Sequence, residues 1–164
     1  MLDSRMELAL NQQVNAELWS SYLYLSMSYD MDNKGYEGMA SWFALQAKEE
    51  FIHATRFMKF IGEMDGKVNL MPIKEVRQDW NSPADAFEDT LKHEKVVTQK
   101  IHNLMDLAIE LKDYATQSML KWFIDEQVEE EDIARKILEK VKRIDNNLNG
   151  LYALDKQLSK RGND

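Results

Sequence analysis

The residues best suited to chemistry are polar side chains that interrupt apolar stripes near the middle of four long segments. They are Glu17 in the first stripe, Glu50 and His53 in the second, Glu94 in the third, and Gln127 and Glu130 in the fourth. Residues three positions apart share one face of a helix, so each pair points the same way. Buried carboxylates are costly unless a cation binds them, and no Lys or Arg lies nearby on these stripes. The pattern predicts a metal site whose donors suit iron or manganese and also admit zinc.

A repeated spacing indicates that the four interruptions converge. Glu17 and Glu50 are 33 residues apart, and so are Glu94 and Gln127. In each half of the chain, one carboxylate therefore faces a pair at positions i and i+3 on the next helix. This layout is typical of two-metal carboxylate centres inside four-helix bundles. The alternative is a metal-free bundle in which these carboxylates are protonated or lie elsewhere.

Other polar residues near the stripes have two interpretations each. Tyr24 follows Glu17 by seven residues, so its hydroxyl could reach the polar layer or bond to any other buried acceptor. Glu49, Glu126 and Glu129 could hold a third ion at the rim of the layer, or they could be part of a solvated acidic run. Packing explains Trp122 better than chemistry does, and His93 and His102 are interpreted as surface or interhelical residues.

The elements that must position these residues are long helices. The chain has two prolines and six glycines, and the breaks predict helices over residues 4–31, 38–65, 83–111 and 114–143, with a short fifth helix over 147–160. The connection over residues 67–82 could span roughly 50 Å, more than the roughly 42 Å of a 28-residue helix. We therefore expect one all-α domain over residues 1–164, a four-helix bundle with a long crossover between its second and third helices. The apolar stretch 68–73 is expected to pack along the bundle or on a neighbouring subunit.

Composition limits the classes of partner. The 164 residues carry a net charge of −8 and include no cysteine. Nucleic acids and anionic membranes would be repelled, and thiolate metal sites and disulfides are excluded. We also expect no secretory signal and no membrane-spanning segment, and hence a cytoplasmic protein.

At these residues the sequence resembles the ferritin family, in particular its non-haem bacterial branch, over essentially the whole chain. The marks are Glu17 with Tyr24, the run Glu49-Glu50-Phe51-Ile52-His53-Ala54, Glu94, and the run Glu126-Gln127-Val128-Glu129-Glu130. The resemblance implies one iron site held by Glu17, Glu50 and His53 and a second held by Glu50, Glu94 and Glu130. It further implies Gln127 as a hydrogen-bonding or weak ligand, Tyr24 as a possible electron donor, and a third iron site at Glu49, Glu126, Glu129 and Glu130.

The activity implied by the resemblance is iron storage. Fe(II) would be oxidised by O2 or H2O2, and the Fe(III) oxo-hydroxide mineral would collect inside a hollow homo-oligomeric shell of twenty-four subunits. The fourth segment lacks the second Glu-x-x-His of bacterioferritins and rubrerythrin-type proteins, and Ile52 stands where bacterioferritins carry their haem methionine, so no haem is expected. A soluble rubrerythrin-like di-iron oxidase or peroxidase without storage is the alternative. A helical interaction protein without metal is another, and a DNA-coating mini-ferritin is disfavoured by the charge.

Overall fold

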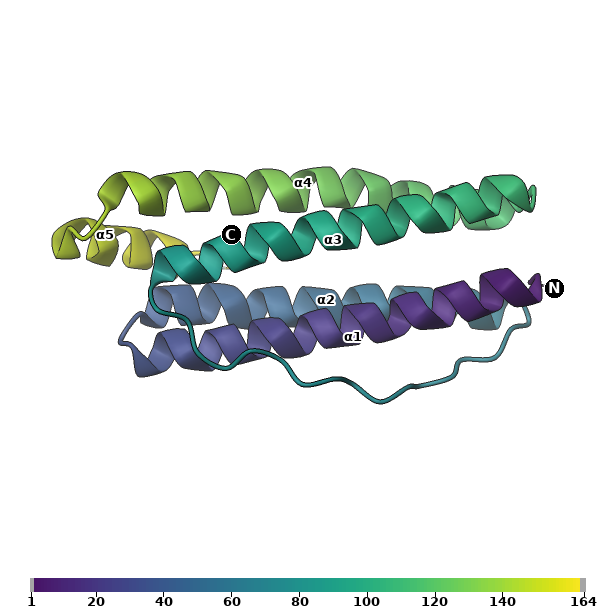
Figure 1. The fold of residues 1–164 in the computed structure, drawn as a ribbon, viewed down its shortest axis with the longest axis horizontal. Helices are drawn as coiled ribbons and strands as arrows, with labels where there is room; N and C mark the ends of the chain where they lie inside the picture. Colours follow the sequence, from purple (N-terminus) through teal and green to yellow (C-terminus); the bar gives the residue numbers. More distant parts are fainter. Residues whose placement is uncertain (1, 163–164) are drawn as a thin grey trace.

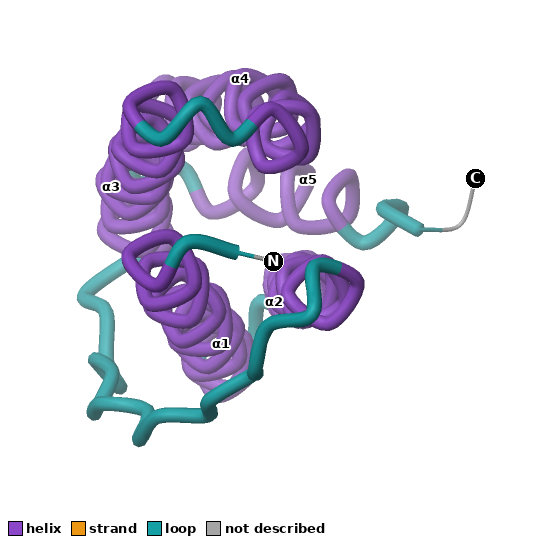
Figure 2. The backbone as a smooth tube through the Cα atoms, turned by 90° about the vertical axis from the view of Figure 1, so that its right-hand side faces the viewer, coloured by secondary structure: helices purple, strands orange, loops and turns teal. Residues whose placement is uncertain are grey.

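The structure, a computed structural model, describes residues 2–162, so residues 1, 163 and 164 of the expected domain lie outside the described part. The described chain is all-helical and confirms the predicted fold class. Its helices are α1 (Ser4–Asn33), α2 (Glu37–Glu63), α3 (Pro83–Glu110), α4 (Tyr114–Ile144) and α5 (Leu148–Leu158). The first four form the bundle, and α5 lies beside one end of it (Figures 1 and 2).

Local side-chain chemistry explains where the helices begin and end. The side chains of Asp3, Ser82, Asp113 and Asn147 accept hydrogen bonds from backbone N–H groups in the first turns of α1, α3, α4 and α5. At α3 the Ser82 cap is followed by Pro83 at the first helical position, a combination that favours the start of a helix. The ends of α2, α3 and α4 are each followed within two residues by a residue with positive φ, and these are Asp65, Lys112 and Asp145 with φ of 58°, 54° and 52°.

The crossover between α2 and α3 runs the length of the bundle beside α1 (Figure 1). Polar side chains along α1 form hydrogen bonds with the backbone of the crossover, with donor–acceptor distances from 2.7 to 3.4 Å. The pairs are Asn11 with Lys67 O and Asn69 N, Asn15 with Met71 O, Trp19 with Glu75 O, and Ser26 with Arg77 O. The crossover is therefore anchored at intervals along α1. Within the apolar stretch 68–73, Val68 packs against the core, whereas Leu70 and Ile73 are exposed on the single chain.

The apolar core is divided into two clusters. One cluster lies toward α5 and includes Met27, Phe43 and Phe87, and the other lies toward the opposite end and includes Phe57 and Phe123. Each bundle helix contributes one segment to each cluster, and the predicted polar residues lie between those two segments. The fold therefore places a polar layer across the middle of the bundle, with apolar packing on both sides.

Candidate metal centre

The polar layer contains all six side chains that interrupt the stripes. They are Glu17, Glu50, His53, Glu94, Gln127 and Glu130, and each has a relative exposure of 5% or less. They come from α1, α2, α3 and α4, so the predicted convergence of four helices is what the structure shows. Buried carboxylates require a compensating partner, and four of them share this layer.

One half of the layer can gather around a cation. Glu17, Glu50 and His53 each offer a ligand atom, and these atoms all lie within 4.8 Å of one another. His53 Nδ1 is 3.4 Å from Glu50 Oε2, and Gln13 Nε2 donates to Glu17 Oε1 at 2.7 Å. Glu17 Oε2 is buried and has no hydrogen-bond partner, and it is the one such side-chain atom within residues 2–162. A bound cation would satisfy that oxygen.

The other half is held by hydrogen bonds. The Tyr24 hydroxyl donates to Glu94 Oε1, and Gln127 Nε2 donates to Glu94 Oε2 at 3.1 Å. Glu130 Oε2 accepts from Gln46 Nε2 at 2.9 Å, and the same nitrogen is 3.2 Å from Glu50 Oε1. Gln46 thus links the two halves. Glu94 and Glu130 do not join the 4.8 Å group found in the described chain.

Burial changes the protonation of all four carboxyls. It raises the pKa of Glu94 and of Glu130 to about 7, and nearby carboxylates add to the shift. Burial also raises the pKa of Glu17 and of Glu50 well above the usual value, with added repulsion from Glu50 and from Glu94 respectively. A divalent cation would remove both causes, because it compensates lost hydration and screens the repulsion.

The residues expected at a third ion are less well assembled. Glu49 is bonded to Arg161, Glu126 is partly buried, and Glu129 is exposed. Burial raises the pKa of Glu126, and the charges of Glu129 and Glu49 contribute. These carboxylates are near enough to repel one another, but they form no compact ligand group with Glu130 among the described residues.

Three partners of the layer were missed at the sequence level, namely Gln13, Gln46 and Arg161. Gln13 and Gln46 each stand four residues before a site glutamate, and this shared i, i+4 spacing could have identified them. Arg161 had no such signal, because it contacts residues more than 100 positions away.

Aromatic side chains and histidines around the layer mostly pack, as expected. Trp122 stands edge-on to His53 with ring centroids 5.5 Å apart, and the Arg56 guanidinium lies 3.9 Å from the Trp122 ring centroid. His93 lies between α1 and α3, where its Nε2 is 2.7 Å from Ser20 Oγ.

Within residues 2–162, no helix combines the length and apolar character needed to cross a bilayer.

Comparisons with known proteins agree with this fold. Residues 7–144 match the family model for the ferritin-like domain. The chain is 38% identical over 161 residues to a bacterial non-heme ferritin of Bacteroides fragilis, covering 98% of this chain and 100% of that protein. It is 36% identical to the Staphylococcus aureus protein of the same name, covering 98% and 97%. A solved structure of an open pore ferritin from the archaeon Archaeoglobus fulgidus superimposes with a TM-score of 0.97 at 42% identity, covering 98% of this chain and 99% of that one.

Proposed function

This chain belongs to the ferritin family, and from that premise we propose that it stores iron by oxidising Fe(II) inside the bundle and depositing Fe(III) mineral in a hollow oligomeric shell. Glu17, Glu50 and His53 hold one iron ion, and Glu50, Glu94 and Glu130 hold the second, with Glu50 shared. The observation that carries this assignment is the buried, unpartnered Oε2 of Glu17 beside Glu50 and His53.

The proposed reaction uses both ions together. Each Fe(II) loses one electron, so O2 gains two electrons and two protons and leaves as H2O2. When H2O2 is the oxidant, it gains two electrons and two protons and leaves as two water molecules. A paired transfer avoids a free one-electron oxygen radical, and the chain has no cysteine that such a radical could oxidise.

The polar residues prepare the layer for iron. At neutral pH Glu94 and Glu130 are partly protonated, because burial raises their pKa to about 7, so Fe(II) binding releases protons. Gln127 holds Glu94 in place, and Tyr24 bonds to the same carboxylate and is positioned to donate an electron. Glu49, Glu126, Glu129 and Glu130 form the proposed third iron position, from which oxidised iron moves toward the mineral.

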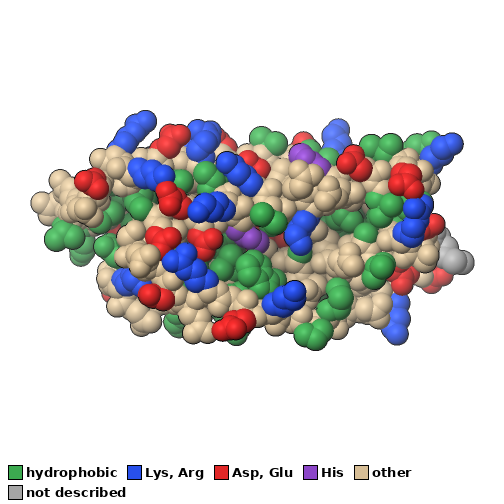
Figure 3. All heavy atoms as spheres, in the orientation of Figure 1, with side chains coloured by type: hydrophobic (Ala, Val, Ile, Leu, Met, Phe, Trp, Pro, Cys, Tyr) green, Lys and Arg blue, Asp and Glu red, His purple; other side chains and the backbone are tan. Residues whose placement is uncertain are grey.

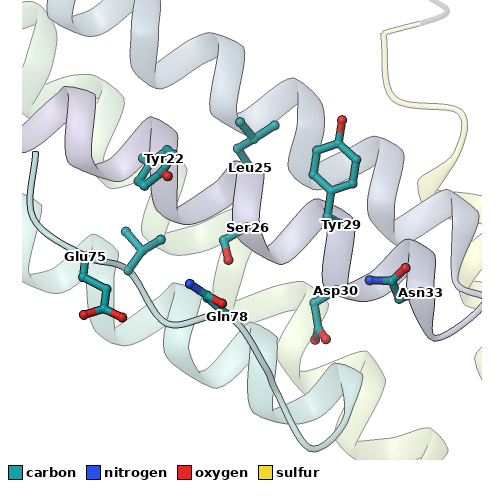
Figure 4. Close-up of a pocket in the computed structure, with 9 residues that line it drawn as sticks. Tyr22, Leu25, Ser26, Tyr29, Asp30, Asn33, Glu75 and Gln78 are labelled. Carbon is teal, nitrogen blue, oxygen red and sulfur yellow. The ribbon is translucent and has the colours of Figure 1, made fainter.

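Exposed apolar surface supports assembly. Tyr22, Leu25 and Tyr29 follow one another on the outer side of α1 beside the crossover (Figure 4), with relative exposures of 51%, 41% and 66%. Leu148 and Tyr152 are exposed on α5. Apolar side chains gathered in this way favour contacts with other copies. We assign the shell twenty-four subunits, a cytoplasmic location and no haem.

Glu50→Ala tests the assignment. It removes the shared ligand without adding a buried charge, so the initial rate of Fe(II) oxidation in air should fall by more than about tenfold, while the size of the assembly stays the same. Glu63→Ala is the matched control, because Glu63 is an exposed acid on the same helix. Equal oxidation rates in Glu50→Ala and Glu63→Ala would refute the site.

A further inference from the structure

Helix α5 is held against the start of α2 through Asp155. Asp155 accepts hydrogen bonds from the backbone N–H groups of Gly38 and Met39 at 3.0 and 2.8 Å. The approach is so close that a Cβ on Gly38 would lie 1.8 Å from the carbonyl oxygen of Asp155. Helix α5 therefore packs on α2 in one defined position. The residues that follow α5 lie against the face of α2 that leads to the polar layer.

Arg161 makes four contacts there. Its guanidinium lies 4.5 Å from the ring centroid of the buried Trp42, and Nη1 donates to Trp42 O at 3.4 Å. Nη2 donates to Gln46 Oε1 at 2.9 Å and to Glu49 Oε2. The Arg161 side chain keeps 22% of its exposure. An arginine stacked on an aromatic ring with two bonded side-chain acceptors has a defined position.

The bond to Gln46 determines which way that amide points. Gln46 Oε1 faces Arg161, so Nε2 faces Glu130 and Glu50, to which it donates. The reversed amide would set its NH2 against the guanidinium and its oxygen against two carboxylates. Arg161 therefore acts through Gln46 on two of the proposed iron ligands without touching either of them.

The bond to Glu49 has a second consequence. Glu49 is also a proposed ligand of the third iron, and a carboxylate oxygen bonded to a guanidinium is a poorer ligand for a cation. We propose that Arg161 is a positioning residue of the iron centre, which orients Gln46 toward Glu50 and Glu130 and which must leave Glu49 before a third ion binds there. This inference rests on the proposed function and adds a competition between the C-terminal turn and the third ion.

The two roles predict effects of opposite sign in one variant. Arg161→Gln frees Glu49, so the third divalent ion should bind about tenfold more tightly, whereas the initial rate of Fe(II) oxidation should fall by up to about tenfold because Gln46 loses its orientation. Arg161→Lys keeps a positive charge near Glu49 but lacks the planar fork, so its third-ion affinity should stay near the wild-type value while oxidation slows. Lys160→Gln is the matched control, since it removes one charge from the exposed neighbouring residue.

The experiment titrates the metal-free assembled protein with Co(II) under anaerobic conditions. The heat of each binding step is measured by calorimetry. Glu49→Gln identifies the third binding step by its loss. Hydrogen exchange of the peptide over residues 148–162 should rise only as the third ion binds, and less in Arg161→Gln, where the turn is already released.

Each outcome discriminates. If wild type, Arg161→Gln and Lys160→Gln bind the third ion equally while the first two ions bind normally, the inference is overturned and the proposed function stands. Weaker binding of all three ions in Arg161→Gln would also overturn it, because that is the result of a structural role alone. A wild-type protein that binds no ions in the layer would instead overturn the proposed function, and this inference with it.

Discussion

Replacing Glu130 by glutamine should stabilise the metal-free protein at neutral pH. Burial, with repulsion from Glu94, raises the pKa of Glu130 to about 7 from an ordinary value of 4.5. The folded state therefore holds the Glu130 proton more tightly than the unfolded state does. Folding stability is lost as the pH rises from 4.5 to 7, and a shift of this size corresponds to about 3 kcal/mol above pH 7. Glutamine resembles the protonated acid and can still accept from Gln46.

The assay compares equilibrium denaturant unfolding of chelator-treated wild type and Glu130→Gln at pH 4.5, 6, 7 and 8, at one protein concentration. The variant should equal the wild type at pH 4.5 and exceed it by about 3 kcal/mol at pH 8. Glu139→Gln, an exposed site on the same helix with a side-chain exposure of 51%, should show no such trend. A variant that is less stable at pH 8, or whose advantage grows as the pH falls, would refute the reasoning.

Three further changes have defined outcomes. Burial lowers the pKa of His93 to about 4, so the unfolded state binds the extra proton at a higher pH than the folded state does. The free energy of unfolding should therefore fall by up to about 3 kcal/mol as the pH drops from 6.5 to 4. In His93→Gln that loss should disappear from the unfolding curves, and an equal loss over this pH range in the variant would contradict the reasoning. Gly38→Ala places a Cβ against Asp155 O, so unfolding free energy should fall by at least about 1 kcal/mol, whereas Gly62→Ala, where a Cβ meets open space, should not destabilise. Tyr24→Phe removes the donor to Glu94, and freeze-quenched samples should lose the tyrosyl radical signal expected of the wild type during Fe(II) oxidation; an equal signal in the variant would exclude Tyr24 as the electron donor.

Periodicity was sufficient to predict the polar layer. A polar residue on an apolar stripe, such as Glu94 on α3, needs only the helical repeat to be placed in the core, and its depth follows from its distance to the helix ends. The long crossover followed from the length of the chain between residues 67 and 82. Both features depend on contacts within one helix or on the reach of one loop, and for these a single sequence is enough.

Contacts between distant elements were not predictable in the same way. Asn11 and Asn15 looked merely polar, yet their amides hold the crossover backbone. Glu49 is predicted as a ligand of a third ion, but nothing in the sequence indicates its bond to Arg161, which lies 112 residues away. The partner of Arg161 depends on where α5 packs on α2. That position is determined by the close approach of Gly38 and Asp155, which no local pattern in the sequence indicates.

Iron loading of the intact protein tests the central claim most directly. Metal-free protein is mixed in air with Fe(II) at many ions per chain, and the products are separated by size-exclusion chromatography with in-line detection of protein and iron. The account predicts iron that co-elutes with a very large assembly, in an amount far beyond the few ions that the carboxylate layer can bind. A small oligomer that retains about two ions per chain, as expected of a di-iron site, would contradict storage, and protein that elutes without iron would contradict the metal centre itself.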